Sequence, residues 1–200
     1  MNPNSIAHPA EAMILSKAAP AVIDRVRQLR MMAFDVDGVL TDGRLWYSAQ
    51  GEQLKAFHVL DGHGLKLLME SGITVALITG RDGAVIGRRA AELGIALVQH
   101  SVRDKAQALQ ALAHEHACNL SEVGYMGDDI IDVPAMQRAG FAASVPNAPA
   151  YVTQAAHWVS TAAGGSGAVR DCCDLILAAQ GKLAAFFSPN ALRLGGGTIQ

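Results

Sequence analysis

Two aspartates lie two positions apart at the end of an apolar run. In the stretch MMAFDVDGVLTDG, residues 31–43, Asp35 and Asp37 close a predicted buried strand and Gly38 follows at once. Burying carboxylates costs free energy unless cations or hydrogen-bond donors compensate for the lost water. We therefore interpret this stretch as a metal site together with a nucleophile.

Polar groups also follow three later predicted strands. In an open parallel sheet, ligands bind beyond the carboxyl ends of the strands, so residues at these ends meet at one edge. Converging carboxylates repel one another unless a cation lies between them, and oxygen ligands with room for water suit Mg²⁺. A lysine and a hydroxyl in the same crevice suit a phosphate. The residues concerned are Thr79, Gly80 and Arg81 at the end of run 73–79, Lys105 after run 95–98, and Asp128 and Asp129 after run 123–126.

The elements that must position these groups alternate along the chain. Alternating strands and helices imply βαβ crossovers and a mostly parallel sheet. We therefore predict an α/β fold with a Rossmann-like sheet flanked by helices on both faces. The expected strands are 31–36, 73–79, 95–98, 123–126, 141–145 and 157–160, and the expected helices are 21–30, 62–72, 85–94, 103–117, 132–140 and 167–180.

One segment, residues 44–59, breaks the alternation. It consists of two short extended runs around a turn near Gln50-Gly51, which predicts a β-hairpin. Its aromatic side chains need burial that an isolated hairpin does not provide. We expect a mobile extension over 1–20, a single domain over 21–183 without a cap domain, and a tail over 184–200 whose glycine run favours mobility.

The composition excludes several classes of partner. Half of the 200 residues are hydrophobic and 17% are charged, which is typical of a compact domain. The net charge of −2 and the lack of a basic block argue against nucleic acid and anionic membranes. No apolar stretch is long enough to span a membrane, and the N-terminus does not look like a signal peptide. Three cysteines without metal-ligand spacing fit a reducing cytoplasm.

Four motifs together resemble a known family. DVDGVLTDG, TGR at 79–81, Lys105 and GDDIID at 127–132 are similar, in this order, to the motifs of the haloacid dehalogenase (HAD) superfamily of phosphohydrolases. The similarity continues through GEQLKAFHVLDGHGLK, AGGSGAVRD and LILAAQGKL. Over about residues 30–183 the chain resembles the capless members that hydrolyse 3-deoxy-D-manno-octulosonate 8-phosphate in lipopolysaccharide inner-core synthesis.

The resemblance implies a role for each motif residue. Asp35 would be the nucleophile that forms an aspartyl-phosphate. Asp37 would protonate the leaving oxygen and then activate water. Asp35, the backbone carbonyl of Asp37, and Asp128 would hold Mg²⁺. Thr79 and Lys105 would hold the transferring phosphoryl group.

The resemblance also implies contacts to a sugar-acid phosphate. Asp129 and Asp132 would support the site, with Asp129 orienting Lys105 or a metal-bound water; both could instead be charges that favour a helix start. His58 could be a structural histidine, and Lys66 and Arg89 could be solvated. Leu60 departs from some family members, which carry a cationic arginine there. The expected substrate contacts are Asp37, His58, Val59, Leu60, Asp61, Gly62, Lys66, Arg81, Arg89 and Lys105, and Gly80 is expected to support them.

Alternative functions remain at this point. A phospho-accepting receiver module uses similar residue types, but its motifs come in a different order along the chain. A phosphatase for a nine-carbon keto-deoxy acid phosphate and a domain that has lost catalysis are further alternatives. The resembled family is tetrameric, so we expect a homotetramer in which the hairpin over 44–59 completes the neighbouring pocket.

Overall fold

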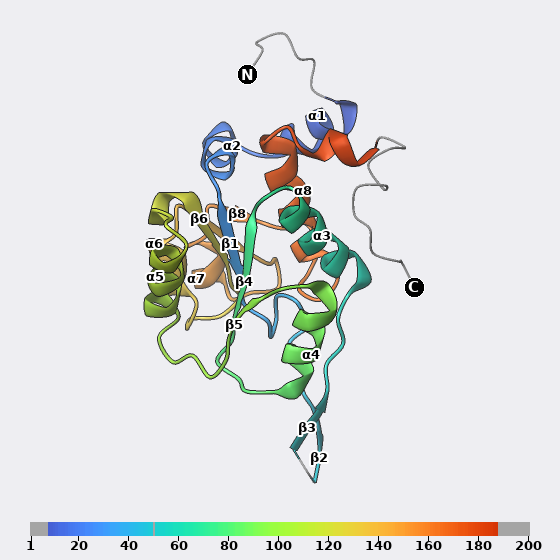
Figure 1. Ribbon diagram of the computed structural model, residues 1–200, viewed down its shortest axis with the longest axis vertical. Coiled ribbons are helices and arrows are strands. Elements are labelled where there is room, and N and C mark those ends of the chain that lie inside the picture. The colour runs from blue at the N-terminus through green and yellow to red at the C-terminus, as the bar shows by residue number, and fades with distance from the viewer. Residues whose placement is uncertain (1–7, 50, 188–200) are drawn as a thin grey trace.

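A six-stranded parallel sheet forms the centre of the protein (Figure 1). The computed structural model describes residues 8–49 and 51–187. The strand order is β5-β4-β1-β6-β7-β8, so the first strand lies between two later ones. This confirms the predicted α/β class. The strands are β1 (Met31–Phe34), β4 (Thr74–Ile78), β5 (Leu97–Gln99), β6 (Val123–Met126), β7 (Phe141–Ser144) and β8 (Trp158–Val159).

Both faces of the sheet are buried, and the side chains of β1 show why. Met32 and Phe34 belong to one hydrophobic cluster, whereas Met31 and Ala33 belong to a second cluster on the other face. Successive side chains of a strand point to opposite faces, so a strand buried on both sides has an uninterrupted apolar sequence. The continuous apolar run that predicted β1 follows from this double burial.

Helices cover each face as the crossovers require. The first cluster contains side chains of α2, α3, α4 and α8, and the second contains side chains of α5, α6 and α7. The two groups lie on opposite sides of the sheet (Figure 1). Their bounds are α2 (Pro20–Arg27), α3 (Val59–Glu70), α4 (Ala84–Leu93), α5 (Lys105–Glu115), α6 (Val133–Arg138), α7 (Ala150–Thr153) and α8 (Ala168–Ala179), with 3-10 turns η1 (Leu120–Glu122) and η2 (Leu183–Phe187).

The predicted hairpin is present and projects from the body of the domain (Figure 1). Strands β2 (Trp46–Ser48) and β3 (Gly51–Leu54) pair antiparallel, with an irregular register after Trp46. The side chains of Trp46, Tyr47 and Leu54 are largely exposed in the single chain.

The N-terminal segment differs from the expected extension. Residues Pro9–Leu15 form helix α1, and Ile14 and Leu15 pack against the first hydrophobic cluster. A carboxylate oxygen of Glu11 accepts a hydrogen bond from the Ala184 backbone N–H of η2 at 2.9 Å. The packed structure thus begins before residue 21 and includes the start of the expected tail. The glycine run of that tail lies outside the described residues. None of the helices formed by 8–49 and 51–187 has the length and apolar character needed to cross a membrane.

Candidate active site

The candidate site lies where the direction of the strand order changes. Strand β1 has β4 on one side and β6 on the other, and parallel α/β sheets bind ligands at such a point. Asp35 follows β1 directly, and its backbone N–H donates to the Met126 carbonyl at 2.9 Å. Thr79 follows β4, and Asp128 comes two residues after β6. The topology therefore brings together three groups that are far apart in the sequence.

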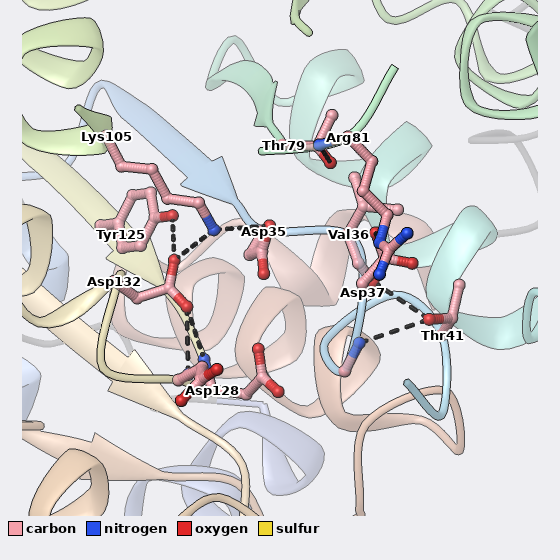
Figure 2. Close-up of polar contacts among 12 residues, drawn as sticks. Asp35, Val36, Asp37, Thr41, Thr79, Arg81, Lys105, Tyr125, Asp128 and Asp132 are labelled. Atoms are coloured by element: carbon pink, nitrogen blue, oxygen red, sulfur yellow. Dashed lines mark hydrogen bonds and ion pairs between the residues drawn. The ribbon is translucent and has the colours of Figure 1, made fainter. Parts of the chain in front are cut away.

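A buried lysine connects the nucleophile candidate to a second carboxylate (Figure 2). The Nζ atom of Lys105 lies 2.9 Å from Asp35 Oδ1 and 2.6 Å from Asp132 Oδ1. The hydroxyl of Tyr125, a buried β6 residue, donates to the same Asp132 oxygen at 2.6 Å. Because Lys105 is the first residue of α5, its charge reaches the sheet edge from the start of a helix.

Asp132 also holds the loop that carries the last motif. Its Oδ2 atom accepts hydrogen bonds from the backbone N–H groups of Asp128 and Asp129, at 3.2 and 3.1 Å. The Asp129 carboxylate instead accepts from the N–H of Ile130. Of the two roles expected for Asp129, contact with Lys105 belongs instead to Asp132, which lies three residues further along and is fully buried. The other role, orienting a metal-bound water, stays a prediction.

Three carboxylates lie close enough to share a cation. Ligand oxygens of Asp35, Asp128 and Asp132 are all within 4.8 Å of one another. Burial, together with the charge of Asp132, raises the pKa of Asp35 to about 8 and that of Asp128 to about 6, although Lys105 partly opposes both shifts. The arrangement therefore disfavours two ionised carboxylates unless a cation joins them.

The donor set fits Mg²⁺. Asp132 already accepts four hydrogen bonds, so Asp35 and Asp128 are the members of the group with ligand capacity to spare. Oδ1 of Asp128 is buried and has no hydrogen-bond partner among the described residues. A buried carboxylate oxygen without a hydrogen-bond partner, close to a second carboxylate, suits a hard divalent cation such as Mg²⁺.

Gly38 allows the first and last motifs to approach each other. Its φ is +93°, and a Cβ atom there would lie 1.9 Å from Asp128 Oδ2. A second close approach involves Gly164, where a Cβ atom would lie 1.7 Å from the Gly38 carbonyl oxygen. The loop before α8 thus packs directly on the loop that follows β1. Thr41 secures the latter loop, because its Oγ1 accepts from the backbone N–H groups of Gly38 and Gly43.

Asp37 points away from this cluster and toward the base of the hairpin. It forms an ion pair with Lys55, whose Nζ also lies 2.5 Å from Glu52 Oε1. Arg81 Nε is 3.7 Å from Asp37 Oδ2, and its Nη1 donates to the Tyr47 hydroxyl at 3.3 Å. The predicted residues Asp37 and Arg81 are therefore adjacent. Lys55 and Glu52 were not predicted, although both lie in the quoted stretch GEQLKAF.

A small pocket gathers several of the expected substrate contacts. His58, Gly62 and Arg89 line it together with apolar side chains of the core. Nδ1 of His58 and Nε of Arg89 are buried and have no hydrogen-bond partner within 8–49 and 51–187. The Arg89 guanidinium also lies over the Phe57 ring, 5.7 Å from its centroid. These two nitrogens are candidates for hydrogen bonds to a polar ligand group.

The other expected contacts are placed differently. The buried Asp61 carboxylate accepts hydrogen bonds from the backbone N–H groups of Gly167 and Arg170 at the start of α8. Both oxygens of this side chain are therefore hydrogen-bonded in the interior, and the expected substrate contact of the segment from His58 to Gly62 stays a prediction. Val59 and Leu60 expose their side chains at the first turn of α3, and Lys66 is exposed on the same helix.

Comparison with known proteins agrees with this geometry. A family model described as haloacid dehalogenase-like hydrolase matches residues 95–170. The 3-deoxy-D-manno-octulosonate 8-phosphate phosphatase of Yersinia pestis is 44% identical over 165 residues, which cover 82% of this chain and 88% of that protein. The chain belongs to the 3-deoxy-D-manno-octulosonate 8-phosphate phosphatase family. The Haemophilus influenzae phosphatase of this family is 42% identical over 162 residues, covering 81% of this chain and 90% of that protein.

Solved structures of the phosphatase family have the same fold. The Moraxella catarrhalis phosphatase, in complex with magnesium ion, phosphate ion and a KDO molecule, superposes with a TM-score of 0.81 at 42% identity, covering 82% of this chain and 95% of that one. The cobalt-bound Haemophilus influenzae phosphatase gives a TM-score of 0.81 at 40% identity, covering 84% of this chain and 99% of that one. The predicted HAD-like fold and family are thereby confirmed.

Proposed function

We propose that this chain is a Mg²⁺-dependent phosphatase that hydrolyses 3-deoxy-D-manno-octulosonate 8-phosphate to 3-deoxy-D-manno-octulosonate and inorganic phosphate. The observation that carries the proposal is the buried Asp35 carboxylate, which Lys105 holds at the end of the central strand, 4.8 Å or less from Asp128. Relatives that are 44% and 42% identical to this chain over the aligned residues are phosphatases named for this substrate.

The first step transfers the phosphoryl group to the protein. A carboxylate oxygen of Asp35 attacks phosphorus, and the bond from phosphorus to the sugar oxygen breaks. Asp37 gives its proton to that oxygen, so the sugar acid leaves as an alcohol. Lys105 and the Thr79 hydroxyl stabilise the charge on the transferring oxygens.

The second step regenerates the enzyme. The Asp37 carboxylate, now unprotonated, takes a proton from water, and the resulting hydroxide attacks the phosphorus of the aspartyl-phosphate. The Asp35–phosphorus bond breaks, which returns the carboxylate and releases inorganic phosphate. Asp35, the Asp37 carbonyl and Asp128 would hold Mg²⁺, and the charge of that ion would screen the repulsion between the nucleophile and the phosphate.

The sugar-acid end of the substrate needs cations of its own. Arg81 lies beside Asp37 and therefore close to the leaving oxygen, whereas Arg89 lies in the small pocket with His58. We assign these two arginines, and the exposed Lys66, to the substrate hydroxyl and carboxylate groups. Leu60 offers no charge at its position.

We further propose that the enzyme is a homotetramer in which the hairpin completes a neighbouring pocket. The support is the exposure of Trp46 at 56%, Tyr47 at 63% and Leu54 at 64%, because large apolar side chains on a two-stranded hairpin are typical of a surface that another chain covers. Sedimentation at micromolar concentration tests this, since a fully active monomer would contradict it. We place the reaction in the cytoplasm, in lipopolysaccharide inner-core sugar synthesis, on the strength of the family resemblance.

A panel of phosphate esters tests the proposed substrate. Phosphate release is measured with Mg²⁺ for the eight-carbon sugar-acid phosphate, its nine-carbon homologue and simple hexose phosphates, using the wild-type chain and Asp35→Asn. The highest kcat/KM is expected for the eight-carbon ester, with no turnover by Asp35→Asn. A preference for the nine-carbon ester would change the substrate but keep the chemistry. Turnover by Asp35→Asn would contradict the covalent mechanism.

A further inference from the structure

A lysine of the hairpin base contacts the proposed acid and base residue. The Lys55 side chain is 2% exposed, although it follows directly after strand β3 of a projecting hairpin. It forms ion pairs with both Asp37 and Glu52. Arg81 lies near the same two carboxylates, at 3.7 Å from Asp37 and 3.9 Å from Glu52. Two cations and two anions therefore form a compact network that includes Asp37.

A purely structural ion pair is the simplest alternative. Such a pair would serve only to attach the hairpin to the domain. However, even a buried ion pair is weak evidence for a stabilising role, because the cost of removing both charges from water offsets much of their attraction. Lys55 is buried against Asp37, the second aspartate of the first motif, whose position the proposed proton transfers require. Because the partner of Lys55 is Asp37, a role in the reaction explains the contact better than a role in stability does.

We propose that Lys55 is a positioning residue for Asp37, with Glu52 as its second anchor. Lys55 restricts the Asp37 carboxyl group to one side of the loop, where it faces the leaving oxygen of a phosphate ester bound at Asp35. Glu52 keeps the lysine in place when Asp37 is neutral after taking a proton from water. The base of each hairpin thus completes the pocket of its own subunit, independently of any neighbour. This inference rests on the proposed function, because it assumes that Asp37 exchanges protons with the substrate oxygen and with water.

The leaving group provides a selective test. A sugar alkoxide is a poor leaving group and needs a proton, whereas acetate departs from acetyl phosphate without one. The constant kcat/KM reports steps up to the first irreversible one, here the formation of the aspartyl-phosphate. A residue that positions the acid should therefore matter for the sugar phosphate and hardly for acetyl phosphate. A residue that merely stabilises the fold would affect both to the same extent.

The experiment measures kcat/KM for both compounds in the full-length chain with saturating Mg²⁺. The variants are Lys55→Met, which removes the charge and keeps the bulk, and Lys55→Arg, which keeps the charge. Asp37→Asn gives the reference pattern for a lost acid. Lys182→Met is the matched control, because this half-buried lysine donates to the Ser71 carbonyl at 2.9 Å, away from the site.

We expect Lys55→Met to lower kcat/KM for the sugar phosphate by about 10²-fold, the lower end of the range for general acid catalysis. The loss for acetyl phosphate should be less than about fivefold, and Lys55→Arg should recover at least part of the sugar phosphate activity. Equal losses on both compounds, or unchanged kcat/KM on both, would overturn the proposal. If Lys55→Met fails to fold, Lys55→Arg and Glu52→Gln decide the question by the same comparison, the loss of kcat/KM on the sugar phosphate relative to the loss on acetyl phosphate. A wild-type chain inactive on both compounds would instead refute the proposed function itself.

Discussion

Replacing Asp132 by asparagine tests the buried network directly, because its carboxylate accepts four hydrogen bonds. An asparagine side chain has only one acceptor oxygen, so it can keep the hydrogen bonds of only one of the two carboxylate oxygens. With its oxygen toward the backbone, its NH₂ group faces the Lys105 ammonium, while the Tyr125 hydroxyl can rotate and accept. With its oxygen toward Lys105, its NH₂ group faces two backbone N–H groups. The first orientation is the less costly one.

The expected cost follows from the charge-assisted bond that this orientation loses. Hydrogen bonds to charged groups contribute about 1.5–3 kcal/mol, and an unpaired buried donor adds roughly 1–3 kcal/mol. Removing a negative charge also relieves repulsion of Asp35 and Asp128, which offsets part of that cost. We expect the free energy of unfolding to fall by about 2–4 kcal/mol, which lowers Tm by roughly 4–16 °C for a chain of this size.

The matched control is Asp129→Asn in the same motif. That carboxylate is exposed and accepts only a local hydrogen bond from Ile130. Differential scanning calorimetry in excess Mg²⁺ should show a shift below about 2 °C for it, because such surface changes fall within ±0.5 kcal/mol. Asp132→Asn should also lower kcat by on the order of tenfold or more, because Lys105 loses one of its two anchors. Equal melting temperatures for the two variants would refute the assignment of Asp132 as the centre of the network.

Three further predictions concern glycine geometry, metal binding and pH. Gly38→Ala should abolish both activity and the Mg²⁺-induced rise in Tm. The control is Gly72→Ala, which should lose stability alone, because Gly72 has a similar φ of +87° but open space around it. Retained activity in Gly38→Ala would contradict the close approach of the Gly38 loop to Asp128. The raised pKa values of about 8 for Asp35 and about 6 for Asp128 mean that protons compete with the metal for both carboxylates as the pH falls. The Mg²⁺-induced rise in Tm should therefore be larger at pH 8 than at pH 6. An equal rise at both pH values would count against these two residues as ligands. Burial, with a smaller contribution from Arg25, lowers the pKa of His157, so its neutral form is favoured on folding and stability should fall as the pH drops through the pKa of the unfolded histidine near 6.5. Since His157 Nδ1 accepts from the Ala142 N–H, His157→Asn keeps an acceptor and should lose less Tm between pH 7.5 and 5.5; an identical loss would exclude His157 as the titrating group.

The parts of the site that follow strand ends could be predicted from the sequence. Asp35, Thr79 and Asp128 each come after an apolar run, and the rule for parallel sheets brings such positions together. Lys105 could be included because it begins the helix after another short strand. These predictions need only the order of elements and the residue types at their ends.

Contacts that depend on side-chain direction could not be predicted in this way. Tyr125 reads as one more apolar strand residue, and nothing in VGYM indicates that its hydroxyl meets Asp132. Asp61 reaches a helix start more than a hundred residues away, which no local pattern encodes. For Lys55 the sequence does contain a signal, because Glu52 and Lys55 place two charges within the aromatic hairpin. A proline at the start of Pro9–Leu15, with an acidic residue in the first turn, would likewise have predicted α1.

The central place of β1 has a consequence for how the protein opens. Strand β1 is hydrogen-bonded to a neighbour on both sides, so exposing its amides requires splitting the sheet, whereas β2 and β3 have only each other. Amide hydrogens around Asp35 should therefore exchange only through global unfolding, and those of the hairpin through inexpensive local fluctuations. The two halves of the chemistry differ accordingly. The proposed phosphoryl acceptor, Asp35, directly follows a strand that is paired on both sides, whereas the proposed proton donor, Asp37, is ion-paired to Lys55 at the base of the two-stranded hairpin. Mild warming should therefore impair proton transfer to the sugar oxygen before the acceptor site is lost.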